Sequence, residues 1–595
     1  MGYKMKTTIL YLFSAALKYK PSYLFVYIAD IIVKTVTPFV NIIFPKYLIA
    51  ELLGERRMQY IVGYILSIAF GNFIGHFLTS YLQEKLNKYY HDDFSKYFDA
   101  LFARKNMQIP YISTEDKEVM KKAQKARDGL GSQSGGIGGI ASSLSQAISN
   151  VFVFAGAAGL LLANSPYVFL IVTVGVIAVY FLNKRINQIQ VSYFEKISEN
   201  NRGYEYVLYN LTAVRYGKDI RLYQAQDMMS SQADQYNQNM AEIGRKQAKD
   251  VMPWHEMSKV VMALREGSSF LYLGYLGLKG FIDIADFTML VNASSALGNA
   301  LNGVITQMQE IVKRTLFAYE YVEFMQMDIE KTSQGRTVEH QQTHTIEFKN
   351  VSFTYPGTDK KALDNVSALI KPGEKISIVG SNGAGKTTFI KLLCRLYKVD
   401  AGEILLDGVN INEYKMEDYL KIISVVFQDF MLLGFPLREN VVLSDSGKIT
   451  EGEVMNLFSK VGLKEKVLSL PMGIDTPVFR YFDLNGFEPS GGEQQKIAIA
   501  RALYKNGSIM VLDEPTAALD PISEAEIYEK FNDLVKNKTA FFISHRLSSC
   551  KFCDRILVFD KGHIIEEGTH QNLMNLENGM YANMYRTQAQ YYQYS

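Results

Sequence analysis

Residues 380–388 have the types and spacing of a phosphate-binding loop. They read Gly-Ser-Asn-Gly-Ala-Gly-Lys-Thr-Thr, follow an apolar run at 376–379 and precede a helical pattern at 389–393. Glycines let backbone N–H groups turn inward around phosphate oxygens, and a helix N-terminus adds positive potential there. In this pattern Lys386 reaches the β- and γ-phosphates, and the Thr387 hydroxyl ligates Mg²⁺. We therefore expect the chain to bind a nucleoside triphosphate with Mg²⁺. The expected contacts are Gly380, Ser381, Asn382, Gly383, Gly385, Lys386, Thr387 and Thr388.

Two adjacent carboxylates, Asp513 and Glu514, end a second apolar run at 508–512. A carboxylate at the C-terminal end of a buried strand can hold Mg²⁺ through water, the role expected of Asp513. Glu514 can orient and polarise the attacking water as a general base. Gln428, after the strand 422–427, is expected to contact the nucleotide and the metal. The predicted metal set is therefore Thr387, Gln428 and Asp513.

Two further segments point to a γ-phosphate. The sequence Ser-Gly-Gly-Glu at 490–493 precedes a helical run at 494–503, so its backbone N–H groups predict a second anion-binding helix N-terminus. His545 follows the strand 540–543 and is placed to contact the γ-phosphate, which adds it to Glu514 as a catalytic candidate. The predicted contacts from the first segment are Ser490, Gly491, Gly492 and Glu493.

The elements that carry these residues occupy only the second half of the chain. Residues 1–325 contain long apolar runs, 326–342 form a polar linker, and 343–595 read as an α/β domain. A helix needs about 20 apolar residues to cross a bilayer. We therefore expect an α-helical membrane domain of six transmembrane helices with long cytoplasmic extensions, followed by an α/β P-loop nucleotide-binding domain. The candidate spans are 22–49, 59–82, 140–163, 166–183, 257–279 and 287–311, of which the last two are weaker.

Basic residues set the expected orientation. The segments 83–135 and 184–256 are long and rich in lysine and arginine, whereas the connector 163–166 is short and uncharged. The positive-inside rule then places both termini on the cytoplasmic side of the cell membrane. Asp30 and Lys34 lie four residues apart inside the first span, which favours a self-neutralised pair over a substrate contact.

Composition argues against two classes of protein, those that bind nucleic acid and those that are held together by disulfides. A net charge of +2 gives no nucleic-acid footprint, so no nucleic-acid partner is expected. Only three cysteines in 595 residues argue against a disulfide framework.

These motifs, in this order, resemble an ATP-binding cassette (ABC) exporter half-transporter over essentially the full length. The resemblance rests on the loop 380–388, Gln428, the Ser-Gly-Gly segment, Asp513-Glu514, the Ala-Leu-Asp at 518–520 and His545. Tyr355 matches the aromatic residue that stacks on adenine in this family. The segment 216–223 resembles a coupling segment of such exporters, and 111–116 is where the first coupling segment is expected.

The resemblance implies ATP-driven export across the cytoplasmic membrane by alternating access. Family members bind two ATP molecules between two cassettes, and each site combines one phosphate loop with the other subunit's signature. The partner is then a second copy of the chain or a paralogous half-transporter. Pro489 and Glu493 depart from the usual Leu-Ser-Gly-Gly-Gln, so homodimer and heterodimer both stay open. The cargo could be a drug, a peptide or a lipid, and similar exporters occur in Gram-positive bacteria.

Other functions fit the sequence less well. A regulatory or gating subunit that binds ATP without pumping has no need of a water-orienting carboxylate at Glu514. A soluble ABC protein would lack the apolar spans. An importer is disfavoured because the spans precede the cassette in one chain.

Overall fold

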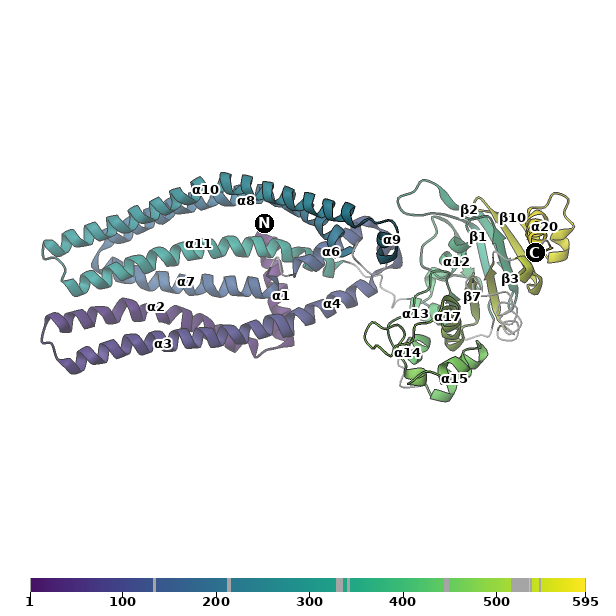
Figure 1. Cartoon of the computed structure of the whole chain (residues 1–595), viewed down its shortest axis with the longest axis horizontal. Coiled ribbons are helices and arrows are strands. Elements are labelled where there is room, and N and C mark those ends of the chain that lie inside the picture. Colours follow the sequence, from purple (N-terminus) through teal and green to yellow (C-terminus); the bar gives the residue numbers. More distant parts are fainter. Residues whose placement is uncertain are drawn as a thin grey trace. The chain divides into compact units, whose positions relative to one another are not determined.

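The computed structural model divides into two compact units, each described by itself (Figure 1). The helical unit comprises Met1–Met107 and Lys121–Met327, and the α/β unit comprises Gln108–Met120 and Asp328–Ser595. His545 and the Ala-Leu-Asp at 518–520 lie outside the described residues. The structure describes residues 2–131, 135–210, 216–327, 335–339, 343–443, 449–514, 535, 538–544 and 547–593.

Long helices account for the helical unit, as its apolar runs predict. A π-helical turn at Tyr89–Phe94 joins α3 to α4. Pro166 begins α8, a position where its missing N–H costs no hydrogen bond. The helices are α1 (Gly2–Tyr19), α2 (Tyr23–Leu53), α3 (Met58–Lys88), α4 (Ser95–Gln108), α6 (Lys117–Gly129), α7 (Gly136–Asn164), α8 (Pro166–Glu205), α9 (Gly217–Leu222), α10 (Gln226–Leu278) and α11 (Ile284–Gln326).

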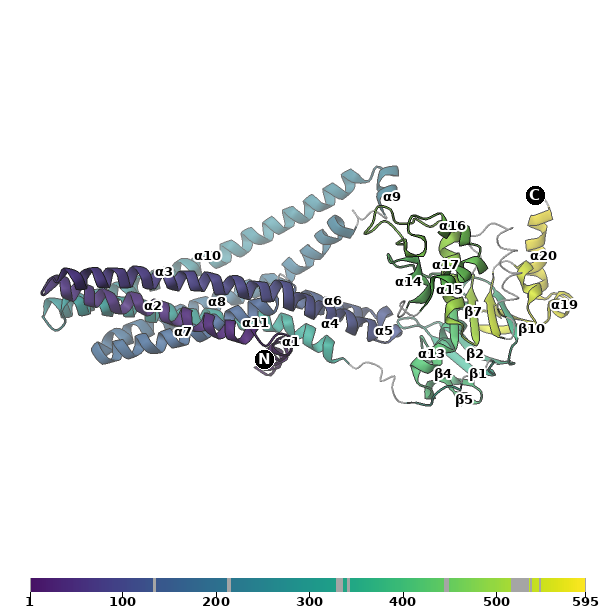
Figure 2. The ribbon, with the colours of Figure 1, turned by 90° about the horizontal axis from the view of Figure 1, so that it is seen from below.

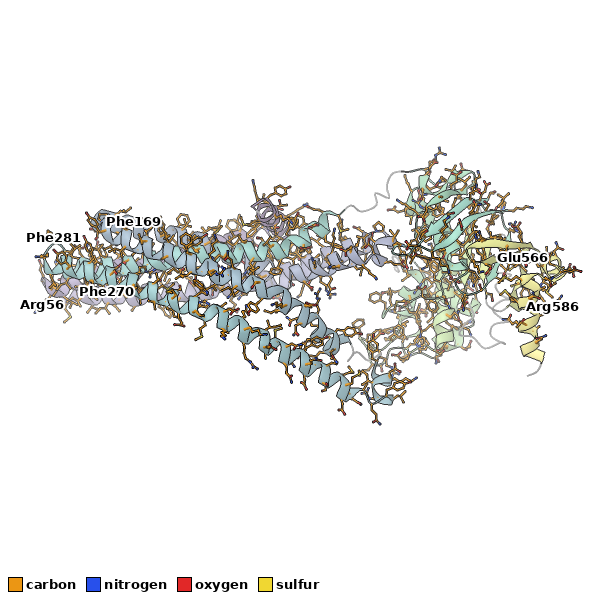
Figure 3. The ribbon with its side chains drawn as sticks, turned by 90° about the horizontal axis from the view of Figure 1, so that it is seen from above. Arg56, Phe169, Phe270, Phe281, Glu566 and Arg586 are labelled. Carbon is orange, nitrogen blue, oxygen red and sulfur yellow. The ribbon has the colours of Figure 1, made fainter. Side chains whose placement is uncertain are left out.

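Among the residues that the structure describes, four helical stretches are long and apolar enough to cross a membrane. They are Tyr23–Leu53, Met58–Gln108, Gly136–Asn164 and Pro166–Tyr193. The spans expected at 257–279 and 287–311 are helical, within α10 and α11, but do not reach the same apolar composition among the described residues. Six spans therefore stay a prediction. Many apolar side chains of this unit are exposed, among them Phe270 and Phe281 near the α10–α11 connection (Figure 3), as in a membrane protein.

The helices pack in pairs, α2 with α3, α7 with α11 and α8 with α10 (Figures 1 and 2). Arg265 of α10, one of the charges that weakens the fifth expected span, is buried. A Cβ added at Gly175 would lie 2.8 Å from its Cγ, and one at Gly298 2.4 Å from its Nη1. Its guanidinium pairs with Glu266 at 2.9 Å. Two glycines thus make room for an arginine inside the helical unit.

The described strands of the α/β unit form two sheets. The strand order is β2-β1-β4-β5 in one sheet and β10-β9-β3-β8-β7-β6 in the other. The strands are β1 (Ile346–Thr354), β2 (Lys361–Ile370), β3 (Lys375–Gly380), β4 (Ala401–Leu406), β5 (Val409–Asn410), β6 (Ile423–Val426), β7 (Ile509–Asp513), β8 (Thr539–Ile543), β9 (Arg555–Asp560) and β10 (His563–Gly568). Its α-helices are α5 (Tyr111–Glu115), α12 (Lys386–Leu393), α13 (Met416–Lys421), α14 (Leu437–Val442), α15 (Glu451–Lys460), α16 (Lys464–Leu468), α17 (Gly491–Lys505), α19 (His570–Met574) and α20 (Met580–Gln593).

The second sheet brings the predicted site together. Strands β9, β3, β8, β7 and β6 pair in parallel, and β10 pairs antiparallel with β9. The carboxyl ends of parallel strands share one edge, where ligands bind in such folds. Strand β8 lies between β3, which ends at the phosphate loop, and β7, which ends at Asp513. At the other end of the unit, Glu566 of β10 accepts a hydrogen bond from the Tyr581 N–H of α20 at 3.0 Å (Glu566 is labelled in Figure 3).

Two segments outside the cassette core join the α/β unit. Helix α5, where the first coupling segment was expected, belongs to it by its contacts. Part of the expected linker is packed rather than free. The Arg336 N–H donates to the Glu413 carbonyl at 2.8 Å, and Val338 is buried in the core.

Candidate nucleotide-binding site

The loop between β3 and α12 has a backbone that only glycine adopts easily. Gly380, Gly383 and Gly385 have φ angles of +150°, +77° and +107°. A Cβ at Gly380 would lie 2.2 Å from the Phe559 carbonyl oxygen, and one at Gly385 2.7 Å from Leu363 Cδ2. Side chains at these two positions would displace the loop from the sheet. The spacing that predicts a phosphate-binding loop is therefore matched by the conformation of this loop.

Lys386, the first residue of α12, folds its ammonium group back over the loop. Its Nζ donates to the carbonyl oxygens of Gly380 and Ser381, both at 2.9 Å. Burial lowers the pKa of Lys386, whereas the carboxylates of Glu514 and Asp513 favour its charged form. The ammonium group is thus positioned at the loop and can turn toward a phosphate.

Thr387 and Asp513 meet where a metal ion is expected. The Thr387 hydroxyl donates to Asp513 Oδ2 at 3.0 Å. The Asp513 side chain is 1% exposed, and its other oxygen, Oδ1, is buried without a hydrogen-bond partner. Burial raises the pKa of Asp513 to about 6. A carboxylate with one unpartnered oxygen beside a hydroxyl is a donor set that suits Mg²⁺, which prefers oxygen ligands.

Glu514 is fixed by contacts to its backbone and its side chain. Its φ is +49°, unusual for a residue other than glycine, and its N–H donates to the Ile543 carbonyl at 2.9 Å. Gln495 Nε2 donates to the Glu514 carbonyl at 3.0 Å. Gln428 Nε2 donates to the Glu514 carboxylate at 2.9 Å. Strained backbone held by its surroundings is common at functional sites. Gln495 was missed from the sequence, although it lies two residues after the Ser-Gly-Gly-Glu segment.

Tyr355 is joined to the first turn of α12. Its hydroxyl lies 3.0 Å from the Thr388 hydroxyl, and the Lys391 ammonium lies 5.8 Å from its ring centroid. An aromatic ring next to the phosphate loop is the arrangement expected for a residue that stacks on a base. The structure thus places Tyr355 beside the loop, and its role with adenine stays a prediction.

A second tyrosine, Tyr397, links Tyr355 to α5. The Tyr397 ring lies 5.3 Å from that of Tyr355 and 5.6 Å from that of Tyr111, edge-on in both cases. The Tyr397 hydroxyl donates a hydrogen bond to the Glu115 carboxylate. Burial, and then this hydrogen bond, raise the pKa of Tyr397, so its hydroxyl stays a donor. No local pattern marks Tyr397, because its partner lies 282 residues away in the sequence.

The Ser-Gly-Gly-Glu segment forms the N-terminus of α17. Ser490 is the N-cap: its N–H donates to the Glu493 carboxylate at 2.8 Å, and the Glu493 N–H donates to its hydroxyl at 3.3 Å. This is a capping box, which a glutamate or a glutamine can form. The Pro489 carbonyl accepts from Gln494 Nε2 at 3.0 Å. The two departures from the family signature therefore fit a well-formed helix start.

The predicted site residues fall into two groups. The phosphate loop, including Ser381 and Asn382, lies with Asp513, Glu514, Gln428 and Tyr355. Among the described residues, no direct hydrogen bond or ion pair is found between the group Ser490, Gly491, Gly492 and Glu493 and the phosphate loop. His545 lies outside the described part of the chain.

Comparisons with known proteins agree with this geometry. Residues 363–517 match the family model described as ABC transporter. The subtilin transport ATP-binding protein SpaT of Bacillus subtilis is 29% identical over 91% of this chain and 88% of its own length. The ATP-dependent lipid A-core flippase of Pseudomonas aeruginosa is 35% identical, over 52% of this chain and 50% of its own.

The fold has a counterpart among solved structures. The structure of a bacterial Atm1-family ABC exporter with ATP bound matches with a TM-score of 0.81. The match covers 97% of this chain and 99% of the other, at 21% sequence identity, and it concerns the fold.

Proposed function

We propose that two identical copies of this ATP-driven exporter, whose residues 363–517 match the ABC transporter family, bind two ATP molecules between their cassettes. In each site one copy supplies the phosphate loop, Tyr355 and Glu514, and the other supplies Ser490 to Glu493. The second copy is needed because one chain holds one set of each kind. The proposed location is the cell membrane, with six spans and both termini in the cytoplasm.

The observation that carries this proposal is the arrangement around Asp513. A buried, unpartnered carboxylate oxygen beside the Thr387 hydroxyl, next to the glycine-rich loop 380–385, suits a metal ion bound to a phosphate chain. The residues that would hold Mg²⁺ are Thr387, Asp513 and, through its amide oxygen, Gln428. When bound, Mg²⁺ would neutralise charge on the β- and γ-phosphates.

Glu514 is the proposed general base for hydrolysis. Gln428 and Gln495 hold its carboxylate and its backbone, so that the side chain can accept a proton from the attacking water. Lys386 would leave the loop carbonyls for the phosphate oxygens, and His545 would contact the γ-phosphate. Tyr355 would stack on adenine. These roles rest on the chemistry of the residues and their placement.

Closure of two cassettes around ATP would drive the membrane halves from inward-facing to outward-facing. Contacts with the γ-phosphate that exist only in the closed dimer supply the difference in binding free energy that such a shift requires. We propose that α5 carries this signal out of the α/β unit, because it is anchored on Tyr397 beside the adenine-stacking candidate Tyr355.

ATP turnover by the purified chain in lipid nanodiscs tests the proposal. The wild type should hydrolyse ATP in the presence of Mg²⁺, and Glu514→Gln should bind ATP but turn it over at least 100-fold more slowly, the order lost with a general base. Turnover that is second order in chain at low concentration in detergent would support the homodimer. ATP binding without turnover by the chain alone would contradict the homodimer and favour a paralogous partner.

A further inference from the structure

The helical unit contains a polar cavity among α2, α7 and α11. Its volume is about 620 Å³, within the range of about 300–1,000 Å³ that is usual for ligand pockets. Five side-chain amides line it, and Lys34 adds one cation; no aromatic side chain is among the lining residues that the structure describes. The amides are Asn41, Gln146, Asn150, Asn292 and Asn299.

The amides follow helical spacing, so each helix presents a polar stripe to the cavity. On α7, Gln146 and Asn150 are four residues apart, and on α11, Asn292 and Asn299 are seven apart with Ser295 between them. Residues at such intervals share a helix face. Polar side chains in a membrane domain are costly against lipid and usually face protein, water or a ligand.

Three of these amides are unused within the chain. Asn41 exchanges two hydrogen bonds with Asn72, each at 2.9 Å, which shows one side-chain amide recognising another. By contrast, Gln146, Asn150 and Asn299 have no hydrogen bond through their side chains among the described residues. They therefore keep both donors and acceptors for a molecule in the cavity.

Prolines in α2 add backbone acceptors on the same face. Pro45 has no N–H, so the Asn41 carbonyl loses its regular helical donor, and Asn292 Nδ2 donates to it instead at 3.0 Å. Pro38 likewise removes the regular donor of the Lys34 carbonyl. Both prolines line the cavity. Interrupted backbone at membrane depth is tolerated where it lines a water-filled cavity or is buried in protein.

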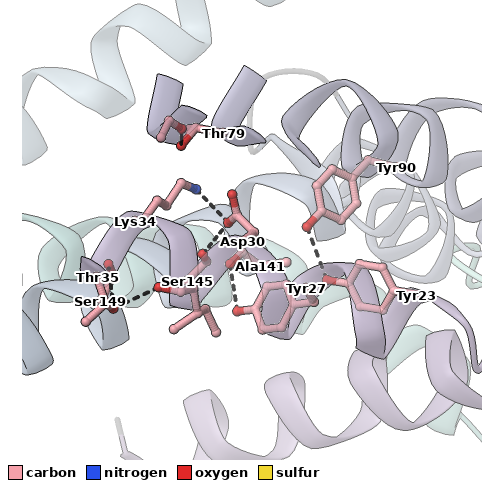
Figure 4. Close-up of polar contacts among 12 residues, drawn as sticks. Tyr23, Tyr27, Asp30, Lys34, Thr35, Thr79, Tyr90, Ala141, Ser145 and Ser149 are labelled. Carbon is pink, nitrogen blue, oxygen red and sulfur yellow. Dashed lines mark hydrogen bonds and ion pairs between the residues drawn. The ribbon is translucent and has the colours of Figure 1, made fainter. Parts of the chain in front are cut away.

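The cavity carries no net charge. Lys34 Nζ lies 2.6 Å from Asp30 Oδ2, as the sequence predicts for this pair, and that oxygen also accepts from the Ser145 hydroxyl at 2.6 Å (Figure 4). The Asp30 side chain is buried, with its Oδ1 unpartnered. An anionic head group would have to compete with Asp30 for the one cation, so the cavity suits a neutral ligand with many hydrogen-bonding groups.

Resting on the proposed export function, we propose that this cavity binds a peptide substrate through its backbone amides. Each peptide unit offers one N–H and one C=O, which the free side-chain amides and the Lys34 carbonyl, whose regular helical donor Pro38 removes, complement. A phosphorylated lipid would need an unpaired cation. A sugar would gain from an aromatic face that the described lining lacks. The amides bind the backbone irrespective of sequence, so selectivity among peptides would arise elsewhere.

Binding measured without nucleotide tests the inference on the full chain in nanodiscs. The probe is a fluorescently labelled, end-blocked hexapeptide of glycine and alanine, compared by anisotropy with the same peptide methylated at every backbone nitrogen. Methylation removes the N–H donors and keeps the carbonyls. We expect the methylated peptide to bind at least tenfold more weakly, and dodecyl phosphate not to displace the parent peptide. Equal binding of both peptides, no binding of either, or displacement by dodecyl phosphate would overturn the proposal.

A double variant checks the location of the site. Asn150→Leu with Asn299→Leu keeps similar side-chain volume and should weaken peptide binding about tenfold, the loss of two modest hydrogen bonds. Asn237→Leu, on the exposed part of α10, is the matched control and should bind as the wild type does. Unchanged binding by a double variant with normal chromatography and thermal unfolding would place the site elsewhere. If that variant does not fold, the two peptides on the wild type still decide.

The two proposals fail separately. Peptide binding without Glu514-dependent turnover would contradict the transport mechanism and keep the cavity assignment. Turnover without peptide binding would contradict the cavity assignment alone.

Discussion

Replacing Tyr397 with phenylalanine removes one oxygen atom from the contact that holds α5 in the α/β unit. The ring contacts with Tyr111, Phe353 and Tyr355 stay available to phenylalanine. What is lost is the hydrogen bond to the Glu115 carboxylate. The substitution therefore separates the polar part of the α5 contact from its aromatic part.

The size of the effect follows from the exposure of the two partners. Hydrogen bonds to charged groups contribute about 1.5–3 kcal/mol. Tyr397 is buried, but Glu115 is exposed and returns to water when its donor is removed. The lower end of the range applies, about 1.5 kcal/mol, or roughly a tenfold change in the equilibrium between docked and undocked α5.

Hydrogen–deuterium exchange of residues 108–120 measures that equilibrium directly, because local opening sets the exchange rate. We expect roughly tenfold faster exchange in Tyr397→Phe, and the same in Glu115→Leu, whose side chain has no oxygen to accept the hydrogen bond. The two together should add nothing further, since either change removes the same bond. Tyr414→Phe is the control: it removes a buried hydroxyl that donates to the Leu406 carbonyl at 3.1 Å, away from α5.

Two results would refute this reasoning. Exchange of 108–120 that does not respond to Tyr397→Phe would mean that the aromatic contacts alone hold α5. Additive effects of Tyr397→Phe and Glu115→Leu in the double variant would mean that the two groups act independently.

Three further predictions concern charge. Glu493→Gln keeps the capping box and removes a negative charge where a γ-phosphate is proposed to bind. The ATP concentration for half-maximal turnover should therefore fall severalfold, while the free energy of unfolding changes by less than about 1 kcal/mol. An unchanged ATP dependence of turnover would contradict this prediction. Asp513→Asn should abolish Mg²⁺-dependent turnover yet raise the unfolding temperature of the nucleotide-free protein, because it removes a buried carboxylate whose desolvation outweighs the Thr387 hydrogen bond and the charge of Lys386. A lower unfolding temperature would contradict this balance. Asp30→Asn and Lys34→Met should each destabilise the helical unit by about 3–5 kcal/mol, and the double variant should be destabilised by much less. Thermal unfolding in detergent measures this, and a double variant that is less stable than either single variant would contradict the prediction.

Local sequence was sufficient for the phosphate-binding loop and for much of the fold. The positive φ angles at 380, 383 and 385 require glycine at these three positions within one short loop, so the motif could be predicted from the spacing of the glycines alone. Strands before the loop and before Asp513 also follow from short apolar runs. The capping box of Ser490 and Glu493 is equally local, and a serine three residues before a glutamate indicates it.

Contacts between segments that are distant in the sequence could be identified only in the tertiary structure. Glu115 and Tyr397 are 282 residues apart, and neither type nor spacing pairs them. The polar cavity depends on how α2, α7 and α11 are rotated about their own axes. A different rotation of these helices would direct Gln146, Asn150 and Asn299 toward lipid or toward the core instead. Periodicity tells which residues share a face of one helix. Only the packing of several helices decides which faces meet, since that depends on the shape of every neighbour at once.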